Sequence, residues 1–306
     1  MINYKNNVLL KSLYHFYKKI CSNRYTIGVM EFEERVVETI CDNSTLKFHW
    51  IKDNYKKGWF ADPFILRLSD SEIVFLVEEF VYCKNRGVIS KLIVNRKNYS
   101  IKSVKTILDT GSHLSFPAYY RKNGKVYIYP ESGERGATYL YEYNEDNDEI
   151  KELYMINPNV TADTILVDLP ISGGGRYQLC TTEPTCNKDI LDIYPFKEEP
   201  CSPVLSPIAR IKVEKMTARN AGVVFEVNGR MYRPAQDCTY HYGECTEIQE
   251  LIVNDNSINF RPVNRIYSPN HIYPDSFHTF NVFENCLVAV DARKKRFPIL
   301  AKLLGK

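Results

Sequence analysis

Charged and amide side chains recur in this sequence at the edges of short apolar runs. The side chains at the starts of five such runs are Asp62, Ser115 with Phe116, Asp163, Arg219 with Asn220, and His278. Those at the ends of the runs that follow are Glu78, Glu79, Glu131, Arg233, Gln236, Asp237 and Asp291. Burying so many charged groups is costly unless they serve a purpose. Carboxylates beside arginine and histidine suit general acid–base catalysis or the recognition of hydroxyl groups.

Several of these residues also have a structural interpretation. Asp62 precedes Pro63, and an aspartate in such a position often caps a turn through its side chain. For Asp62 we favour a functional role, and for Asp291 a structural one. For Glu131 and Asp163 both interpretations stay open.

The segments that carry these residues repeat along the chain. Each copy has a short polar motif, an apolar run, a turn and a second apolar run. Two of the turns are Asn123-Gly124 and Asn228-Gly229, and Asn-Gly between apolar runs is the strongest short-range signal for a β-hairpin. The copies recur about every 50 residues, which is the period of four-stranded propeller blades.

Five copies predict an all-β fold, a single five-bladed β-propeller with a short N-terminal helix. Residues 25–300 form the propeller, whose blades start near residues 60, 114, 161, 218 and 277, and residues 1–24 form an N-terminal extension. The first strand of each propeller blade lines the central channel, so we expect the five polar motifs to converge at one end of it.

The segments between the repeated hairpins have their own predicted places. Residues 88–94, 138–143 and 246–253 read as outer strands, and a strand within residues 25–50 closes the ring. The proline-rich residues 184–206 read as one long crossing between two blades.

Composition excludes several classes of function. The 306 residues carry a formal net charge of +3, which makes no electrostatic case for nucleic-acid binding. Nine scattered cysteines without a CxxC pair predict reduced thiols rather than a disulfide framework or a zinc site. We find no secretory leader and no apolar run long enough to span a membrane, and therefore expect a cytoplasmic protein.

Residues 6–21 carry apolar side chains at helical spacing together with several lysines. This amphipathic helix either packs on the propeller or makes a peripheral contact with the inner face of a membrane. Both interpretations stay open.

The motifs resemble a known family. The matching segments are Trp59-Phe60-Ala61-Asp62-Pro63-Phe64, Glu78-Glu79-Phe80, His113-Leu114-Ser115-Phe116-Pro117, Pro130-Glu131-Ser132, Arg233-Pro234-Ala235-Gln236-Asp237, Tyr240, Tyr242-Gly243 and His278-Thr279-Phe280-Asn281. Over about residues 25–297 the chain resembles the N-terminal domain of plant glucosamine inositolphosphorylceramide transferases and its bacterial stand-alone relatives. The bacterial relatives imply a role in surface-polysaccharide or capsule biosynthesis. In the plant proteins the propeller accompanies a separate catalytic domain, which keeps a non-catalytic role open.

More distantly, the chain resembles the five-bladed glycoside hydrolases of families 32, 43 and 130. This resemblance implies that Asp62 is a general base and that Asp163 orients and tunes the site. The fourth-blade position that holds the family's general acid reads Arg219-Asn220-Ala221-Gly222, without a carboxylate. This departure argues against simple hydrolysis, and Asp237 is a candidate substitute. His278 stands where some family 43 enzymes hold a water-coordinated ion.

These observations predict a carbohydrate-active propeller, and we favour a glycosyltransferase that uses an anionic, nucleotide- or phosphate-linked sugar donor. The alternatives are a non-catalytic glycan-binding or scaffold propeller and a glycoside hydrolase or phosphorylase. The candidate catalytic residues are Asp62, Asp163, Asp237 and Glu131. The candidate binding residues are Trp59, Glu78, Glu79, His113, Arg219, Asn220, Arg233, Gln236, Tyr240, Tyr242, His278 and Asn281.

In this scheme Arg219 and Arg233 hold the anionic part of the donor, because guanidinium groups suit phosphate or carboxylate. Pairing of each arginine with a neighbouring carboxylate is the structural alternative. The expected partners are a sugar donor and a glycan or glycolipid acceptor. We expect no cofactor, and a divalent cation in the channel is left open.

Overall fold

A computed structural model describes residues 22–38, 43–52, 54–171, 173–182, 189–213, 215–254 and 257–296. The helix expected at residues 6–21 lies outside this part of the chain. Within it, no helix has the length and apolar character that crossing a membrane requires. Cysteines 83, 180, 201, 238, 245 and 286, which lie in the described ranges, form no disulfide.

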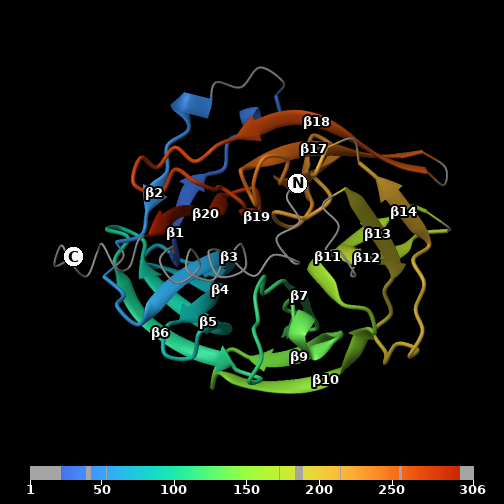
Figure 1. The fold of residues 1–306 in the computed structure, drawn as a ribbon, viewed down its shortest axis with the longest axis horizontal. Coiled ribbons are helices and arrows are strands. Elements are labelled where there is room, and N and C mark those ends of the chain that lie inside the picture. Colours follow the sequence, from blue (N-terminus) through green and yellow to red (C-terminus); the bar gives the residue numbers. More distant parts are fainter. Residues whose placement is uncertain are drawn as a thin grey trace, which may run out of the picture.

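The described chain forms twenty strands in five four-stranded antiparallel sheets, which are arranged around a central axis as the blades of a propeller (Figure 1). The predicted all-β, five-bladed architecture is therefore confirmed. Three short 3-10 helices, η2 (Glu34–Val37), η3 (Asn43–Thr45) and η4 (Gly133–Arg135), lie in the connections.

The four strands of each blade follow one another from the central axis outward. Blade 1 contains β3 (Gly58–Leu68), β4 (Glu72–Val81), β5 (Arg86–Asn95) and β6 (Ile101–Leu108). Blade 2 contains β7 (Tyr119–Lys122), β8 (Lys125–Ile128), β9 (Thr138–Asn144) and β10 (Glu149–Asn157). Blade 3 contains β11 (Thr161–Leu169), β12 (Gly175–Thr182), β13 (Ile190–Pro195) and β14 (Ala209–Lys212). Blade 4 contains β15 (Phe225–Val227), β16 (Arg230–Asp237), β17 (Cys245–Asn254) and β18 (Ser257–Ile266). Blade 5 contains β19 (Phe280–Phe283), β20 (Leu287–Arg296), β1 (Ser22–Glu31) and β2 (His49–Trp50).

Blade 5 closes the ring, because it combines strands from both ends of the described chain. β1 pairs with β20 over ten consecutive residues, from Ser22 opposite Arg296 to Glu31 opposite Leu287. A ring closed in this way joins the last blade to the first and keeps the innermost edge of each sheet protected at the centre of the ring. The strand predicted within residues 25–50 is thus confirmed.

The two Asn-Gly pairs form the tight hairpins that the sequence predicts. Asn123 and Gly124 both have positive φ, as do Asn228 and Gly229, and two such residues in succession are typical of a type I′ turn. The first turn joins β7 to β8 and the second joins β15 to β16. Each hairpin brings the innermost strand of its blade back alongside the second strand.

The hydrophobic core lies between neighbouring blades. Phe64, Leu114, Ile128 and Leu179 belong to a cluster that spans blades 1 to 4 and the connections between them. Two further clusters join blade 5 to blade 4 and to blade 1. Since each sheet is covered by its neighbours, the ring stabilises itself through apolar contacts between blades.

One part of the predicted layout is wrong. Residues 184–206 are not a single crossing, because residues 190–195 form β13, the third strand of blade 3. Leu191 and Ile193 are buried in the core. Pro195 is the last residue of the strand, so its missing backbone N–H does not interrupt the hydrogen bonds within the strand. The predicted outer strands within β5, β9 and β17 are confirmed.

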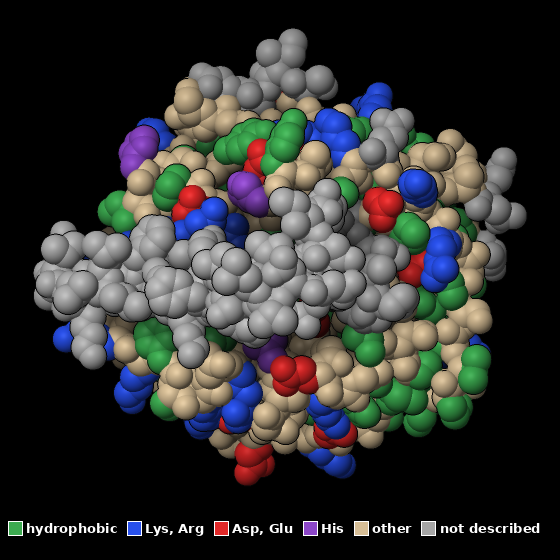
Figure 2. All heavy atoms as spheres, viewed as in Figure 1, with side chains coloured by type: hydrophobic (Ala, Val, Ile, Leu, Met, Phe, Trp, Pro, Cys, Tyr) green, Lys and Arg blue, Asp and Glu red, His purple; other side chains and the backbone are tan. Residues whose placement is uncertain are grey.

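Figure 2 shows Lys and Arg side chains interspersed with Asp and Glu side chains around the rim of one face of the propeller. A surface of mixed sign agrees with the small net charge of the chain.

Replacing Ile27 by alanine tests ring closure. Ile27 lies on β1, is 1% exposed and packs in the cluster between blades 5 and 1. We expect Ile27→Ala to lower the free energy of unfolding by about 2–5 kcal/mol in chemical denaturation. Ile272→Ala is the matched control, because Ile272 is 66% exposed and its loss should cost less than about 0.5 kcal/mol. Equal losses in the two variants would show that β1 does not contribute to the folded ring.

Candidate functional site

A pocket of about 260 Å³ lies where the polar motifs of all five blades meet. The residues that line it are Asn23, Tyr25, Trp59, Asp62, Glu78, Phe80, His113, Ser115, Glu131, Asp163, Arg219, Tyr242 and His278. A cavity of about 300 Å³ beside Lys212 and Glu247 is larger, but no candidate residue lines it. The pocket at the motifs is therefore the candidate functional site.

Unusual backbone geometry places the motif residues at this pocket. Asp62, Phe116 and Asp163 occupy corresponding positions in blades 1, 2 and 3, and all three have left-handed backbone angles, with φ between 45° and 50°. The ladders beside Asp62 and Asp163 show a register shift at this point. Glycine adopts left-handed backbone angles most readily because it has no Cβ. Asp62, Phe116 and Asp163 are therefore strained and need support from their surroundings.

Carboxylates supply that support. The backbone N–H groups of Asp62, Phe116 and Asp163 donate to the side chains of Asp291, Asp62 and Glu131, respectively, each at 3.0 Å. Each acceptor belongs to the preceding blade in the ring: Asp291 to blade 5, Asp62 to blade 1 and Glu131 to blade 2. The same carboxylates thus hold neighbouring blades together and line or adjoin the pocket.

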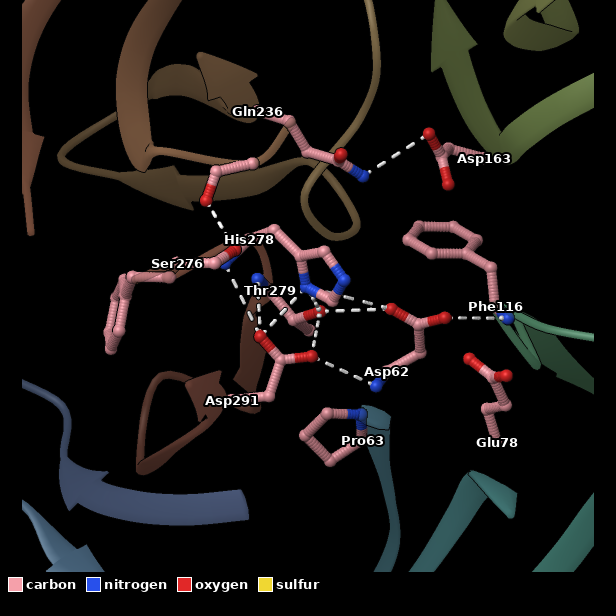
Figure 3. Close-up of polar contacts among 12 residues, drawn as sticks. Asp62, Pro63, Glu78, Phe116, Asp163, Gln236, Ser276, His278, Thr279 and Asp291 are labelled. Atoms are coloured by element: carbon pink, nitrogen blue, oxygen red, sulfur yellow. Dashed lines mark hydrogen bonds and ion pairs between the residues drawn. The ribbon is translucent and has the colours of Figure 1, made fainter. Parts of the chain in front are cut away.

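A hydrogen-bonded cluster joins blade 1 to blade 5. Figure 3 shows the Thr279 hydroxyl between the carboxylates of Asp62 and Asp291. Its Oγ1 lies 3.1 Å from Asp62 Oδ1 and 2.9 Å from Asp291 Oδ2, while His278 Nδ1 lies 2.8 Å from Asp291 Oδ1. All four residues are buried.

The charges within this cluster follow from its geometry. Burial lowers the pKa of His278, but Asp291 and Asp62 more than compensate and raise it above its ordinary value. Burial opposes ionisation of Asp291, yet His278 and the hydrogen bonds to the carboxylate hold its pKa below the usual range. Burial raises the pKa of Asp62 to about 6, although His278 lowers it. His278 and Asp291 therefore form an ion pair, and Asp62 titrates near pH 6.

Asp62, His278 and Asp291 lie close enough to be considered as ligands of a metal ion. The oxygens of Asp291 already accept hydrogen bonds from the backbone of Asp62, from the backbone and ring of His278, and from Thr279. A cation at this position would have to displace these bonds and would meet the positively charged ring of His278. The donor set does not fit such an ion, and we derive no step through one.

A second ionic cluster joins blades 2, 3 and 4. Arg219 donates from Nε to Asp163 Oδ2 and from its NH2 group to Glu131 Oε2 at 3.4 Å. Gln236 Nε2 also donates to Asp163 Oδ2, at 3.2 Å. Burial raises the pKa of Glu131 to about 7, with Asp163 raising it further and Arg219 lowering it. Burial alone would lower the pKa of Arg219, but its acidic neighbours raise it well above the ordinary value, so the guanidinium stays charged.

Glu78 and His113 line the pocket between these clusters. Glu78 Oε1 lies 3.6 Å from His113 Nε2, and His113 Nδ1 accepts a hydrogen bond of 2.9 Å from the backbone N–H of Gly87. Burial raises the pKa of Glu78 well above its ordinary value, and the neighbouring carboxylates raise it further. Burial lowers the pKa of His113.

Aromatic rings form one wall of the pocket. Trp59 and Phe80 are stacked with their ring centroids 4.8 Å apart and an interplanar angle of 4°, and Tyr25 packs against Trp59. Tyr25 also stacks on the His278 ring, and Tyr242 meets that ring edge-on. A wall of aromatic faces opposite a ring of carboxylates suits a ligand with an apolar face and several hydroxyl groups, as a sugar has.

The structure brings nine of the sixteen candidate residues to the pocket, which are Trp59, Asp62, Glu78, His113, Glu131, Asp163, Arg219, Tyr242 and His278. Three amide residues support it from outside. Asn220 donates to the Asp163 carbonyl, Gln236 to the Asp163 side chain, and Asn281 to the Pro63 carbonyl.

The other four candidates lie elsewhere. Arg233 is fully buried behind the pocket, where it donates to Asn220, Gln249 and two backbone carbonyls. Asp237 pairs with Arg265 at 2.8 Å. Glu79 accepts hydrogen bonds from Ser90 and Tyr55, and Tyr240 is 85% exposed.

Sequence analysis missed Asn23 and Tyr25 as pocket residues. They lie on β1, whose position beside β20 depends on pairing across nearly the whole chain. The alternation of β1 between apolar and polar side chains is a signal for a strand, but it gives no indication of which blade receives it.

Comparison with known proteins decides the family. A family model described as "Glucosamine inositolphosphorylceramide transferase 1, N-terminal" matches residues 49–268, more than two thirds of the chain. The chain belongs to this family. The pocket residues from Trp59 to Tyr242 all fall within the matched segment, whereas blade 5 extends beyond it at both ends.

Two curated relatives carry the family's name. Glucosamine inositolphosphorylceramide transferase 1 of Arabidopsis thaliana is 26% identical over 206 residues, and that of Oryza sativa subsp. japonica is 23% identical over 208 residues. Each match covers 64% of this chain but only 26% and 27% of the relatives. The chain thus spans about a quarter of the length of the curated relatives it matches.

Solved structures support the fold. The chain is similar to RS223-β-xylosidase with a TM-score of 0.51 and 10% identity, over 77% of this chain and 92% of that one. A thermostable family-43 glycoside hydrolase gives a TM-score of 0.50 and 14% identity, over 75% and 85%. At such identities the likeness shows the propeller fold alone.

Arg219→Met tests the ionic cluster of blades 2 to 4. Removing a buried arginine leaves Asp163 and Glu131 without their cation. We therefore expect the free energy of unfolding to fall by about 3–5 kcal/mol at pH 8. The loss should shrink at pH 5, because Glu131, with a pKa of about 7, then takes up a proton and no longer needs the arginine.

Arg176→Met is the matched control for this variant. Arg176 pairs with Asp168 at the surface, and an exposed pair is worth less than about 1 kcal/mol. Denaturation curves of both variants at the two pH values measure the difference. A loss in Arg219→Met that is as small as the control, or that does not depend on pH, would contradict this interpretation.

Proposed function

We propose that the protein is a carbohydrate-active enzyme that transfers a glycosyl group, with the pocket of the propeller as its active site. The observation that carries this proposal is the convergence of four carboxyl side chains, one charged arginine and an aromatic wall on a single small pocket. A volume of about 260 Å³ lies just below the usual range of small-molecule pockets, which begins at about 300 Å³, and suits one sugar ring.

The pocket itself takes an uncharged sugar ring in this proposal. Arg219 is engaged by two carboxylates, and Arg233 makes its hydrogen bonds to protein groups behind the pocket. Neither guanidinium is therefore left for an anionic donor group, and the remaining carboxylates would repel one. Any charged part of a donor lies outside the pocket.

Asp62 acts as the general base. It is the pocket carboxylate whose pKa of about 6 leaves it ionised at neutral pH yet basic enough to take a proton from an acceptor hydroxyl. Asp163, Glu131 and Arg219 form a fixed polar wall that orients the sugar through its hydroxyl groups. The curated relatives are named glucosamine inositolphosphorylceramide transferase 1, a name that includes a ceramide lipid, so we propose a glycan or glycolipid as the acceptor.

The second candidate function is glycan binding without turnover. It is favoured because the chain matches only about a quarter of the length of each curated transferase. The activity of those proteins need not belong to the matched part. A thermal-shift screen with uncharged oligosaccharides, sugar phosphates and nucleotide sugars, followed by a turnover assay of each ligand that binds, distinguishes the two functions.

Asp62→Asn tests the role of the base. An asparagine that accepts from the Phe116 N–H and donates to Thr279 keeps both hydrogen bonds, so the fold and ligand binding should survive. We expect kcat/KM to fall by about 100-fold or more. In the wild type kcat/KM should drop as the pH falls through about 6, because protonated Asp62 accepts no further proton.

The variant should lack this acidic limb of the pH profile. A variant that binds and turns over a donor like the wild type would contradict the role of Asp62. Binding without turnover by the wild type, with every ligand of the screen, would favour the non-catalytic function.

A further inference from the structure

Glu78 differs from the other pocket carboxyl groups in its surroundings. Asp62, Asp163 and Glu131 each accept two hydrogen bonds from named protein donors. Within the described residues, Glu78 has its contact with His113 at 3.6 Å and no hydrogen bond. The residue is only 6% exposed, and its side chain lines the pocket. It is therefore a buried carboxyl group that accepts no hydrogen bond from the described residues and faces the pocket.

Such surroundings favour the neutral form of a carboxylic acid. Hydrogen bonds and cations stabilise a carboxylate, whereas burial and neighbouring negative charges destabilise it. The charged or titratable groups around Glu78 are Asp62 from β3, Glu131 after β8, Asp291 from β20, His113 before β7 and Tyr25 from β1. Three of these five are acidic, and the other two are a histidine and a tyrosine.

His113 gives Glu78 no cation. The backbone N–H of Gly87 points at His113 Nδ1, so this nitrogen carries a lone pair and the proton of the neutral ring sits on Nε2. A second proton on Nδ1 would lose this hydrogen bond. His113 Nε2 lies 3.6 Å from Glu78 Oε1, beyond hydrogen-bond distance, and the neutral ring adds no positive charge there.

We propose that Glu78 is the proton donor of the glycosyl transfer, an inference that rests on the proposed function. Asp62 takes the proton of the acceptor hydroxyl as its oxygen forms a bond to the anomeric carbon. The bond from that carbon to the leaving oxygen breaks, and the oxygen takes the proton of Glu78. The cycle ends with Asp62 protonated and Glu78 ionised, and exchange of one proton with water restores both.

This assignment fills a place that the fourth blade leaves open, since Arg219 and Asn220 stand there without a carboxylate. It also defines the class of donor. A leaving group that needs a proton is the alkoxide of a second sugar or an alcohol, whereas a diphosphate leaves readily without one. The substrate class is then an uncharged glycoside, in agreement with the lack of a free arginine in the pocket.

Glu78→Gln tests this role with two donors of the same sugar, a 2,4-dinitrophenyl glycoside and a methyl glycoside. The sugar is the one that stabilises the wild type in a thermal-shift screen. We expect kcat/KM of the variant to fall by about 100-fold or more for the methyl glycoside and by less than about 10-fold for the dinitrophenyl glycoside. Asp62→Asn should slow both.

Glu79→Gln is the matched control. Glu79 is the next residue on β4, is equally buried and bonds to Ser90 and Tyr55 away from the pocket, so its loss should leave the ratio of the two rates unchanged. Equal losses for both donors in Glu78→Gln, or none, would overturn the role of Glu78 and leave the proposed function standing. A wild type that turns over neither donor would overturn both.

An infrared spectrum of the wild type keeps the inference testable if Glu78→Gln does not fold. At pH 8 Asp62 and Glu131 are largely ionised, whereas the proposed role requires that Glu78 keep its proton. A protonated-carboxyl band should therefore persist at pH 8 and shift when the sugar binds. The absence of this band would contradict the assignment.

Discussion

Hydrogen bonds from strained backbone N–H groups to carboxylates of the neighbouring blade hold the centre of this propeller together. A left-handed non-glycine residue costs about 1–3 kcal/mol, and three such residues stand in corresponding positions of blades 1 to 3. A hydrogen bond to a charged acceptor is worth about 1.5–3 kcal/mol, enough to offset that strain. Because Asp62 and Glu131 both accept these bonds and face the pocket, the architecture and the chemistry depend on the same atoms.

This constraint gives the pocket three different carboxyl environments. On the side of blade 5 a histidine–aspartate ion pair adjoins Asp62, and on the side of blades 2 to 4 an arginine lies between two carboxylates. Between them, Glu78 has neither a cation nor a hydrogen-bond donor among the described residues. Carboxyl groups a few ångströms apart thus differ in their affinity for protons, which is the condition for acid and base roles within one site.

The repeat made the architecture predictable from the sequence, because polar motifs and Asn-Gly turns recur at the spacing of propeller blades. Most of the pocket followed from the same repeat. What it did not reveal is which way a side chain faces near the end of a second strand. Glu78 lines the pocket while Glu79 faces away, and Arg233 and Asp237 likewise serve blade 4 rather than the pocket. The alternation along a strand shows that successive side chains point to opposite faces of the sheet. It does not show which face lines the channel.

The pairing of β1 with β20 has a consequence for the synthesis of the protein. Thr279 and Asp291 contact Asp62 across 217 and 229 residues of sequence, so the base is held only after the last strand has joined the first. Contacts of such long range form late in folding. A growing polypeptide therefore has blades before it has a working pocket, and sugar binding would report that the whole ring, from β1 to β20, has been made and closed.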